Sequence, residues 1–165
     1  MTSEQWTLEE LLELLRGAQD LHIRQKEDEQ YAHKDFLMAQ THLERMASEA
    51  RRLRNLEREA INNGEKAQNS RNLTERNIKE NRRGGLSTDE LESQMRRWET
   101  IGERSDIDAR RFADQAVTRQ RHVKAAEDEL KVKRKAYADI RRERLTLVKR
   151  IQMLNGLISQ TTQQR

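Results

Sequence analysis

The chain of 165 residues has no cysteine and no proline, only six glycines, and aromatic residues at just 4%. Without cysteine it can form no disulfide and has no thiol chemistry. Without proline, nothing in the sequence interrupts long helices. No apolar run approaches the roughly twenty residues that cross a bilayer, and the acidic, amphipathic amino terminus does not resemble a secretory signal. We therefore expect a cytoplasmic protein that inserts into no membrane.

Charged residues make up 38% of the chain and hydrophobic residues 33%. A chain this polar cannot surround a central hydrophobic core. Its apolar residues can be buried only along a narrow seam between helices. The formal charge of +4 is a slight excess within a dense mixture of 33 basic and 29 acidic residues, which is weak support for nucleic-acid binding. We expect an extended helical rod.

An apolar stripe runs through the second half of the chain. Stepping alternately by four and three residues from Leu91 to Ile158 meets twenty positions, of which fifteen are apolar. This spacing is typical of a coiled-coil seam. The positions are Leu91, Met95, Trp98, Gly102, Ser105, Ala109, Phe112, Ala116, Arg119, Val123, Ala126, Leu130, Lys133, Tyr137, Ile140, Arg144, Leu147, Ile151, Leu154 and Ile158.

A weaker stripe with the same spacing occupies the first half and thins out after Leu53. Its positions are Leu8, Leu11, Leu15, Ala18, His22, Gln25, Glu29, Ala32, Phe36, Ala39, Leu43, Met46, Ala50, Leu53, Glu57, Ala60, Gly64 and Ala67. Between residues 55 and 81 there are seven asparagines and few apolar seam residues. Low helix propensity and little burial predict fraying or a break there.

The clearest helix-termination signal is the glycine pair at 84–85, because a glycine can end a helix by adopting the left-handed conformation. A second helix should restart directly after it. Ser87 is placed as its N-cap and Glu90 as the acid of a capping box, while Leu86 and Leu91 have the spacing of a hydrophobic staple.

The same pattern recurs near the amino terminus. Thr7 would cap a helix, Glu10 would close the capping box and Trp6 would staple onto Leu11. The first helix should therefore begin near Leu8.

These signals predict an all-α fold in which two long helices form one antiparallel coiled-coil hairpin over residues 1–165. The first helix should span about 8–83, the turn 84–87 and the second helix about 88–160, each arm being about 110 Å long if unbroken. Bulky β-branched residues in place of the two glycines should disturb the turn.

Charge supports antiparallel pairing. Residues 1–30 hold three basic and eight acidic side chains, whereas residues 121–150 hold eleven basic and five acidic ones. Facing residues should have numbers that sum to about 171, which places Gln25 and Glu29 near Arg144. An ion pair of Glu29 with Arg144 inside the seam would specify the register at some cost in stability.

A two-helix rod has almost no concavity in which catalytic groups could converge, so we expect no enzyme activity, no catalytic residue and no cofactor. The glycine pair lacks the downstream lysine of a phosphate loop. The histidines show no metal-ligand spacing, and we interpret His22 as a tolerated polar residue of the seam; the four are His22, His33, His42 and His122.

Two surfaces of the rod are candidate binding sites. Met95, Trp98 and Ile101 lie opposite the weakest part of the first helix, where a poorly covered seam would be open to another protein, although a core role for Trp98 is the simpler interpretation. A basic cluster in the second arm could bind phosphates, but it alternates with acidic residues and is most simply a solvated face, partly paired with the acidic first arm. It comprises Lys131, Lys133, Arg134, Lys135, Arg141, Arg142, Arg144, Lys149 and Arg150.

Several features together resemble the stalk proteins of type III secretion, the FliJ and YscO family. They are the leucine- and glutamate-rich segment 8–16, two long charged helices without proline, and the central turn. The second helix also resembles that family in its general sequence pattern. The similar parts are its first residues at 86–89, Trp98 and the segment 131–137.

The resemblance implies a non-enzymatic central stalk in an export apparatus. In that family the terminal ends of the hairpin enter a hexameric ATPase ring, and the region nearer the tip contacts the export gate. Carried over, this places Leu11, Leu15, Leu154 and Ile158 near the ATPase, together with exposed arginines Arg141, Arg142 and Arg150 that would meet acidic loops. It places Met95, Trp98 and Ile101 near the gate.

Two other functions remain open. A self-associating coiled-coil tether or scaffold would use the same seam, as a parallel dimer or an antiparallel four-helix bundle. Alanines at 109, 116 and 126 permit the close helix approach that either a hairpin or a tight oligomer needs. Nucleic-acid binding through the basic second arm is the weaker alternative and would depend steeply on salt.

Overall fold

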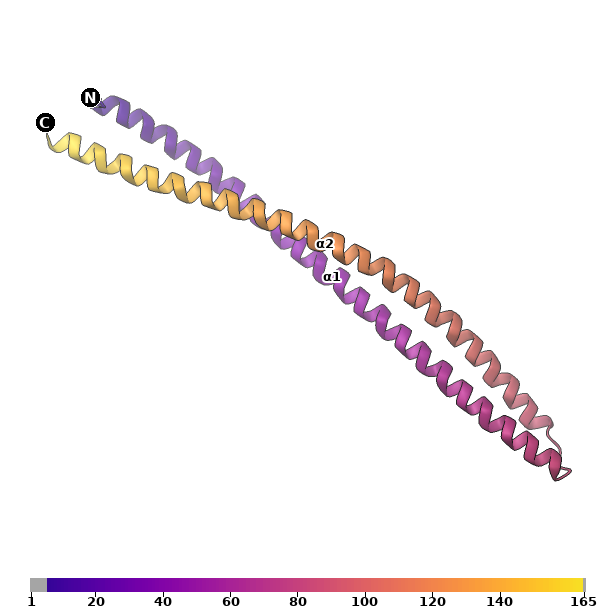
Figure 1. The fold of residues 1–165 in the computed structure, drawn as a ribbon. Coiled ribbons are helices and arrows are strands. Elements are labelled where there is room, and N and C mark those ends of the chain that lie inside the picture. The colour runs from indigo at the N-terminus through magenta and orange to yellow at the C-terminus, as the bar shows by residue number, and fades with distance from the viewer. Residues whose placement is uncertain (1–5, 165) are drawn as a thin grey trace, which may run out of the picture. The chain divides into compact units, whose positions relative to one another are not determined.

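The computed structural model describes residues 6–164 and contains two helices, α1 (Leu8–Arg83) and α2 (Asp89–Gln163). They pack against each other as an all-α helical hairpin, which confirms the predicted fold class (Figure 1). No strand occurs within residues 6–164. Helix α1 has the predicted bounds, and α2 begins one residue later and ends three residues later than predicted. Neither helix, where described, has a stretch that is long and apolar enough to cross a membrane.

The chain forms two compact units, each built from a segment of both helices. Unit 1 consists of Met1–Leu43 and Ala126–Arg165, so it pairs the start of α1 with the end of α2. Unit 2 consists of Glu44–Ala125 and contains the connection between the helices.

The start of α1 is a capping box, as predicted. The Thr7 backbone N–H donates to Glu10 Oε2 at 2.7 Å, and the Glu10 N–H donates back to Thr7 Oγ1 at 3.2 Å. These reciprocal bonds satisfy donors that the first turn leaves free, so the helix begins at Leu8. The backbone and hydroxyl hydrogen bonds from Thr7 lower the pKa of Glu10 below its usual value of 4.5.

Helix α1 ends in a Schellman motif. The Leu86 N–H donates to the Asn81 carbonyl at 2.9 Å, and the Gly85 N–H donates to the Arg82 carbonyl at 3.2 Å. Gly85 has φ of 70°, the left-handed conformation that glycine adopts without a steric penalty. The glycine pair therefore ends the helix as predicted, whereas Leu86 itself stays 64% exposed.

The cap of α2 differs from the predicted one. Thr88, not Ser87, precedes the first helical residue, and its carbonyl accepts the Glu92 N–H at 2.9 Å. Its hydroxyl donates to Glu92 Oε1 at 3.0 Å, and Arg82 Nη2 donates to the same oxygen at 2.7 Å. Arg82 and, to a lesser extent, Thr88 lower the pKa of Glu92. The carboxylate at the start of α2 is thus Glu92 instead of Glu90, because Glu92 reaches an arginine across the connection.

Replacing Gly85 with valine should destabilise the hairpin by about 1 to 2 kcal/mol, because a β-branched residue is strained at this positive φ. Gly84 provides a control position in the same turn. A Cβ at Gly84 would meet only the Asn81 carbonyl oxygen at 3.7 Å and neighbours farther away, and its φ is not positive. Gly84→Ala should change stability by less than about 0.5 kcal/mol. Equal thermal unfolding of Gly85→Val and the wild type would contradict this account of the turn.

Both predicted stripes form the seam between the helices. Every one of their positions is buried or half-buried in the structure. The buried apolar residues of unit 1 are Leu11, Ala18, Ala39, Ala126, Leu147 and Leu154. Those of unit 2 are Met46, Ala50, Ala60, Ala67, Ile78, Ala116 and Val123. The many alanines let the helix axes approach closely.

The prediction of a break within 55–81 is wrong, because α1 is one uninterrupted helix to Arg83. The seam continues beyond the residues counted from the sequence, with Thr74 and Ile78 both buried. The Thr74 hydroxyl donates to the Ser70 carbonyl at 2.8 Å, so its burial leaves no unpaired group. Packing against α2 thus compensates for the low helix propensity of this segment.

Ion pairs between the helices follow the predicted register. In unit 1, Arg144 Nε donates to Glu29 Oε2, the pair expected from the sequence. In unit 2, Arg71 Nε lies 3.0 Å from Glu99 Oε1 and Arg82 pairs with Glu92 at 2.7 Å. The numbers of the residues in each pair sum to about 171, as an antiparallel hairpin with this turn requires.

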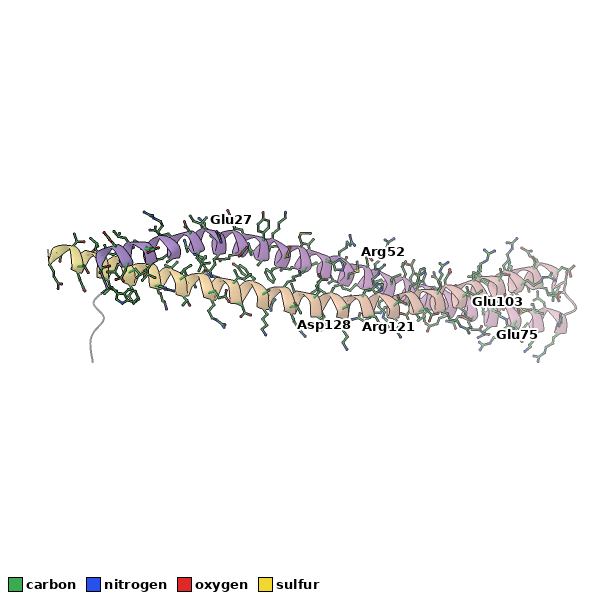
Figure 2. The ribbon with its side chains drawn as sticks, turned by 90° about the horizontal axis from the view of Figure 1, so that it is seen from above. Glu27, Arg52, Glu75, Glu103, Arg121 and Asp128 are labelled. Carbon is green, nitrogen blue, oxygen red and sulfur yellow. The ribbon has the colours of Figure 1, made fainter. Side chains whose placement is uncertain are left out.

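The outward faces of both helices are charged. In unit 1, Glu27 of α1 and Asp128 of α2 project away from the partner helix (Figure 2). In unit 2, Arg52 and Arg121 are exposed in the same way. A charged outer face and an apolar seam are the pattern of a solvated two-stranded coiled coil.

Candidate protein-interaction surfaces

Unit 1 is held together by an apolar cluster that includes four of the predicted partner-binding residues. Leu11 and Leu154 are buried, being 3% and 4% exposed, and they pack in one cluster with Ala18 and Leu147. Leu15 and Ile158 are partly buried against it. The primary role of these four residues is therefore to join the helices, and a partner would meet the surface beside them.

That surface contains a groove, which we call the Trp6 groove. Its apolar lining includes Leu14 and Leu147, and it opens beside Trp6 and Leu21, which are 53% and 47% exposed. A Cβ added to Gly17 would meet no described atom within 4 Å, so the glycine leaves a notch. The lining residues are Trp6, Glu10, Glu13, Leu14, Gly17, Ala18, Leu21, Leu147 and Arg150. An exposed tryptophan beside aliphatic side chains is typical of a protein-docking site.

The three predicted arginines do not form one patch. Arg141 and Arg150 are nine residues apart, which is two and a half helical turns, so they project from opposite sides of α2. Arg142 is 3.9 Å from Asp139 on the same helix, and both side chains are exposed. Arg150 lines the Trp6 groove and has no ion-pair partner within residues 6–164. Arg150 is therefore the arginine best placed to meet a partner's carboxylate at this groove.

A second groove, the Trp98 groove, lies in unit 2. Met95 and Trp98 are half-buried in the seam, whereas Ile101 is 42% exposed. Of these three predicted residues, Trp98 lines the groove. Its rim is acidic, and its residues are Ile61, Gly64, Glu65, Gln68, Arg71, Trp98, Glu99, Gly102, Glu103 and Asp106. Trp98 thus combines the core role and the surface role that the sequence left open.

A polar layer interrupts the seam of unit 1. Glu29 and Arg144 are 15% and 24% exposed at their side chains, and they bind each other across the helices. One turn and two turns before Glu29, Gln25 Oε1 and His22 Nε2 are buried without a hydrogen-bond partner among the described residues. Polar groups at successive seam positions weaken this part of the seam but make a shifted register costly.

The sequence did not predict a third groove, in unit 2 around Phe112. It is lined by Leu53 and Leu56 together with Phe112 and the seam residue Arg119. Arg119 Nη2 pairs with Glu49 Oε2 at 3.0 Å, which accommodates a charge where the apolar pattern lapses. Little in the sequence indicated that Leu56 lines a groove, because Leu56 is not at one of the seam positions.

The Trp6 groove was also missed, although a signal was present. Leu14 and Leu21 each stand one residue before a seam position, and they are seven residues apart. Leucines at this spacing beside a seam widen the apolar face of the helix beyond what one partner helix covers.

No group of three histidine, aspartate or glutamate side chains in the described part of the chain could hold a metal ion. No protein-family model matches the sequence, and no curated protein or solved structure matches it either.

Proposed function

We propose that this protein is a non-enzymatic central stalk of a type III secretion export apparatus, which couples a hexameric ATPase to the export gate. It would work in the cytoplasm and would need no cofactor. Its partners would be proteins. The pairing of both terminal segments in unit 1 supports the proposal, since they present the Trp6 groove and Arg150, which has no ion-pair partner among the described residues.

The coupling would be mechanical. A ring that hydrolyses ATP moves its subunits in turn, and a helical pair held in its centre would transmit this asymmetry without chemistry of its own. Such a role needs helices that do not slide past each other. The Glu29–Arg144 pair supports this, because a shifted register would leave both charges unpaired in the seam.

The Trp98 groove would serve the gate end. Trp98 provides an aromatic side chain in a partly desolvated position, and Glu65 and Glu103 provide an acidic rim. This combination suits a basic partner segment with an apolar anchor. In the same scheme, Arg150 would bind an acidic loop of the ATPase at the other unit.

The proposal is tested with the type III secretion ATPase of the same organism, purified and assayed with and without this chain. The wild-type chain should bind the ATPase and stimulate its hydrolysis. Arg150→Glu should weaken binding about tenfold, because it places a like charge against the acidic loop. The triple reversal of Arg141, Arg142 and Arg150 should abolish stimulation.

The matched control is Arg121→Glu. Arg121 is an exposed arginine of the same helix but belongs to unit 2, so its reversal changes the net charge equally and should leave stimulation unchanged. Failure of the wild-type chain to bind or stimulate the ATPase would refute the proposed function. Equal loss in Arg150→Glu and Arg121→Glu would reduce the effect to net charge.

A further inference from the structure

Helix α1 carries a second, short stripe beside the seam, which we call the Glu10 stripe. It consists of Glu10, Leu14, Gly17, Leu21 and Arg24, spaced alternately by four and three residues like the seam itself. The first four line the Trp6 groove. Leu14 is half-buried against the apolar cluster of unit 1, and the other members are exposed, so no helix within residues 6–164 covers the stripe as a whole. A stripe with this spacing fits another helix.

The stripe is self-complementary. Gly17 is its centre, with one leucine and then one charged residue on each side. If a second copy of α1 runs antiparallel across it, with the two-fold axis at Gly17, Leu14 of each copy meets Leu21 of the other. Glu10 of each copy then meets Arg24 of the other. This is the arrangement that a symmetric, isologous interface requires.

The charged groups at the two ends are available for such pairing. Glu10 Oε2 accepts both bonds from Thr7, and Oε1 accepts none from the described residues. Arg24 has no ion-pair partner within residues 6–164. Glu13 lines the groove on the N-terminal side of Gly17. Arg150 of α2 lines the same groove together with Leu21, which lies on the C-terminal side of Gly17. The same two-fold axis therefore brings Glu13 of one copy toward Arg150 of the other.

The centre of the stripe permits close approach. A Cβ added to Gly17 would meet no described atom within 4 Å, so the helix surface is open at this point. Two glycines facing each other on the axis would let the helices approach to the short end of the usual interaxial range, about 8 Å. Leu14 and Leu21 would then close over the axis from either side.

We propose that a second copy of this chain docks in the Trp6 groove, forming a reversible antiparallel dimer about Gly17. The inference does not depend on the proposed function. On each copy the interface covers only Leu14, Leu21, Trp6 and the other residues that line the groove. Because this interface is small, its dissociation constant should be about tens of micromolar. In a secretion stalk, this dimer would cover Arg150 and so compete with ATPase binding.

Sedimentation equilibrium on the purified chain tests the dimer between about 5 and about 500 µM, in the absence of any ATPase. The wild type should shift from monomer to dimer over this range. Leu21→Glu should weaken the dimer at least tenfold, because it places a charge at the centre of the interface. Leu12→Glu is the control, since Leu12 is 46% exposed, like Leu21 at 47%, but lies off the stripe. It should change the dissociation constant less than about twofold.

Arg24→Glu supplies a second disruptive variant at an exposed, charged position, where the fold is not at risk. It should weaken the dimer several-fold by placing a carboxylate against Glu10. Circular dichroism of each variant checks that the helices are retained.

Disulfide trapping locates the axis, because the natural chain has no cysteine. Gly17→Cys should form a disulfide-linked dimer under mild oxidation, since the two introduced sulfurs face each other at the axis. Gln19→Cys, rotated about 200° around the helix, should remain monomeric.

Three outcomes would overturn the inference: a wild type that stays monomeric at all concentrations, equal effects of Leu21→Glu and Leu12→Glu, or equal trapping of the two cysteine variants. None of them bears on the ATPase assay, which tests the proposed function separately.

Discussion

Replacement of Leu147 by alanine should lower the free energy of unfolding by about 2 to 4 kcal/mol, the largest effect we expect of any single substitution. Leu147 is 7% exposed and packs in the cluster of Leu11, Ala18 and Leu154. The substitution removes buried methyl groups, and a seam between only two helices has few other side chains that could fill the gap. Urea unfolding followed by circular dichroism measures the loss.

The same substitution two residues earlier is the control. Leu145 lies on the same helix but is 46% exposed, so Leu145→Ala removes much less buried apolar surface than Leu147→Ala and should cost less than about 1 kcal/mol. The two variants have the same composition and nearly the same helix propensity. Similar losses in both would mean that Leu147 is not part of a packed seam.

Removing one partner of the Glu29–Arg144 pair should have the second largest effect. Arg144→Leu leaves the Glu29 carboxylate, 15% exposed at its side chain, without its ion pair inside the seam. Because both side chains are partly open to solvent, we expect a loss of about 2 to 3 kcal/mol, below the range for fully buried pairs. Chemical unfolding measures it against the wild type.

The double variant Glu29→Leu with Arg144→Leu separates burial of a charge from loss of packing. Two leucines at these facing seam positions should recover at least most of the lost stability, since an apolar pair pays no desolvation penalty. Arg142→Leu is the surface control, because Arg142 is 79% exposed at its side chain and its pair with Asp139 should contribute less than about 0.5 kcal/mol. If Arg144→Leu costs no more than Arg142→Leu, the seam pair does not determine the register.

Core and surface share residues in unit 1, which matters for both proposals. Leu147 belongs to the apolar cluster and also lines the Trp6 groove. A substitution there changes stability and docking together, so it cannot separate them. Leu21 and Arg150 line the same groove but are exposed, and for that reason they carry the binding tests.

The sequence identified part of the candidate surfaces. Trp98 could be singled out because aromatic residues are rare in the chain, and Arg150 because the second arm is basic. The sequence could not predict which of Arg141, Arg142 and Arg150 faces a groove. All three have similar neighbours in the sequence and differ only in their angular position around α2. Leu14 and Leu21 were not predicted as surface-groove residues. Each precedes a seam position directly, so its apolar side chain could be attributed to the edge of the seam.

The sequence by itself determined the two helices, their seam and the antiparallel register. These depend on local capping bonds, such as those of Thr7, and on a spacing that repeats along the chain, so they can be predicted without knowledge of the fold. The tertiary structure alone decided that residues 55–81 stay helical, because the burial that stabilises them comes from α2. It also decided the cap of α2, because Arg82 reaches Glu92 across the connection. Neither outcome follows from the repeating seam pattern, because both depend on individual contacts that only the packed helices bring together.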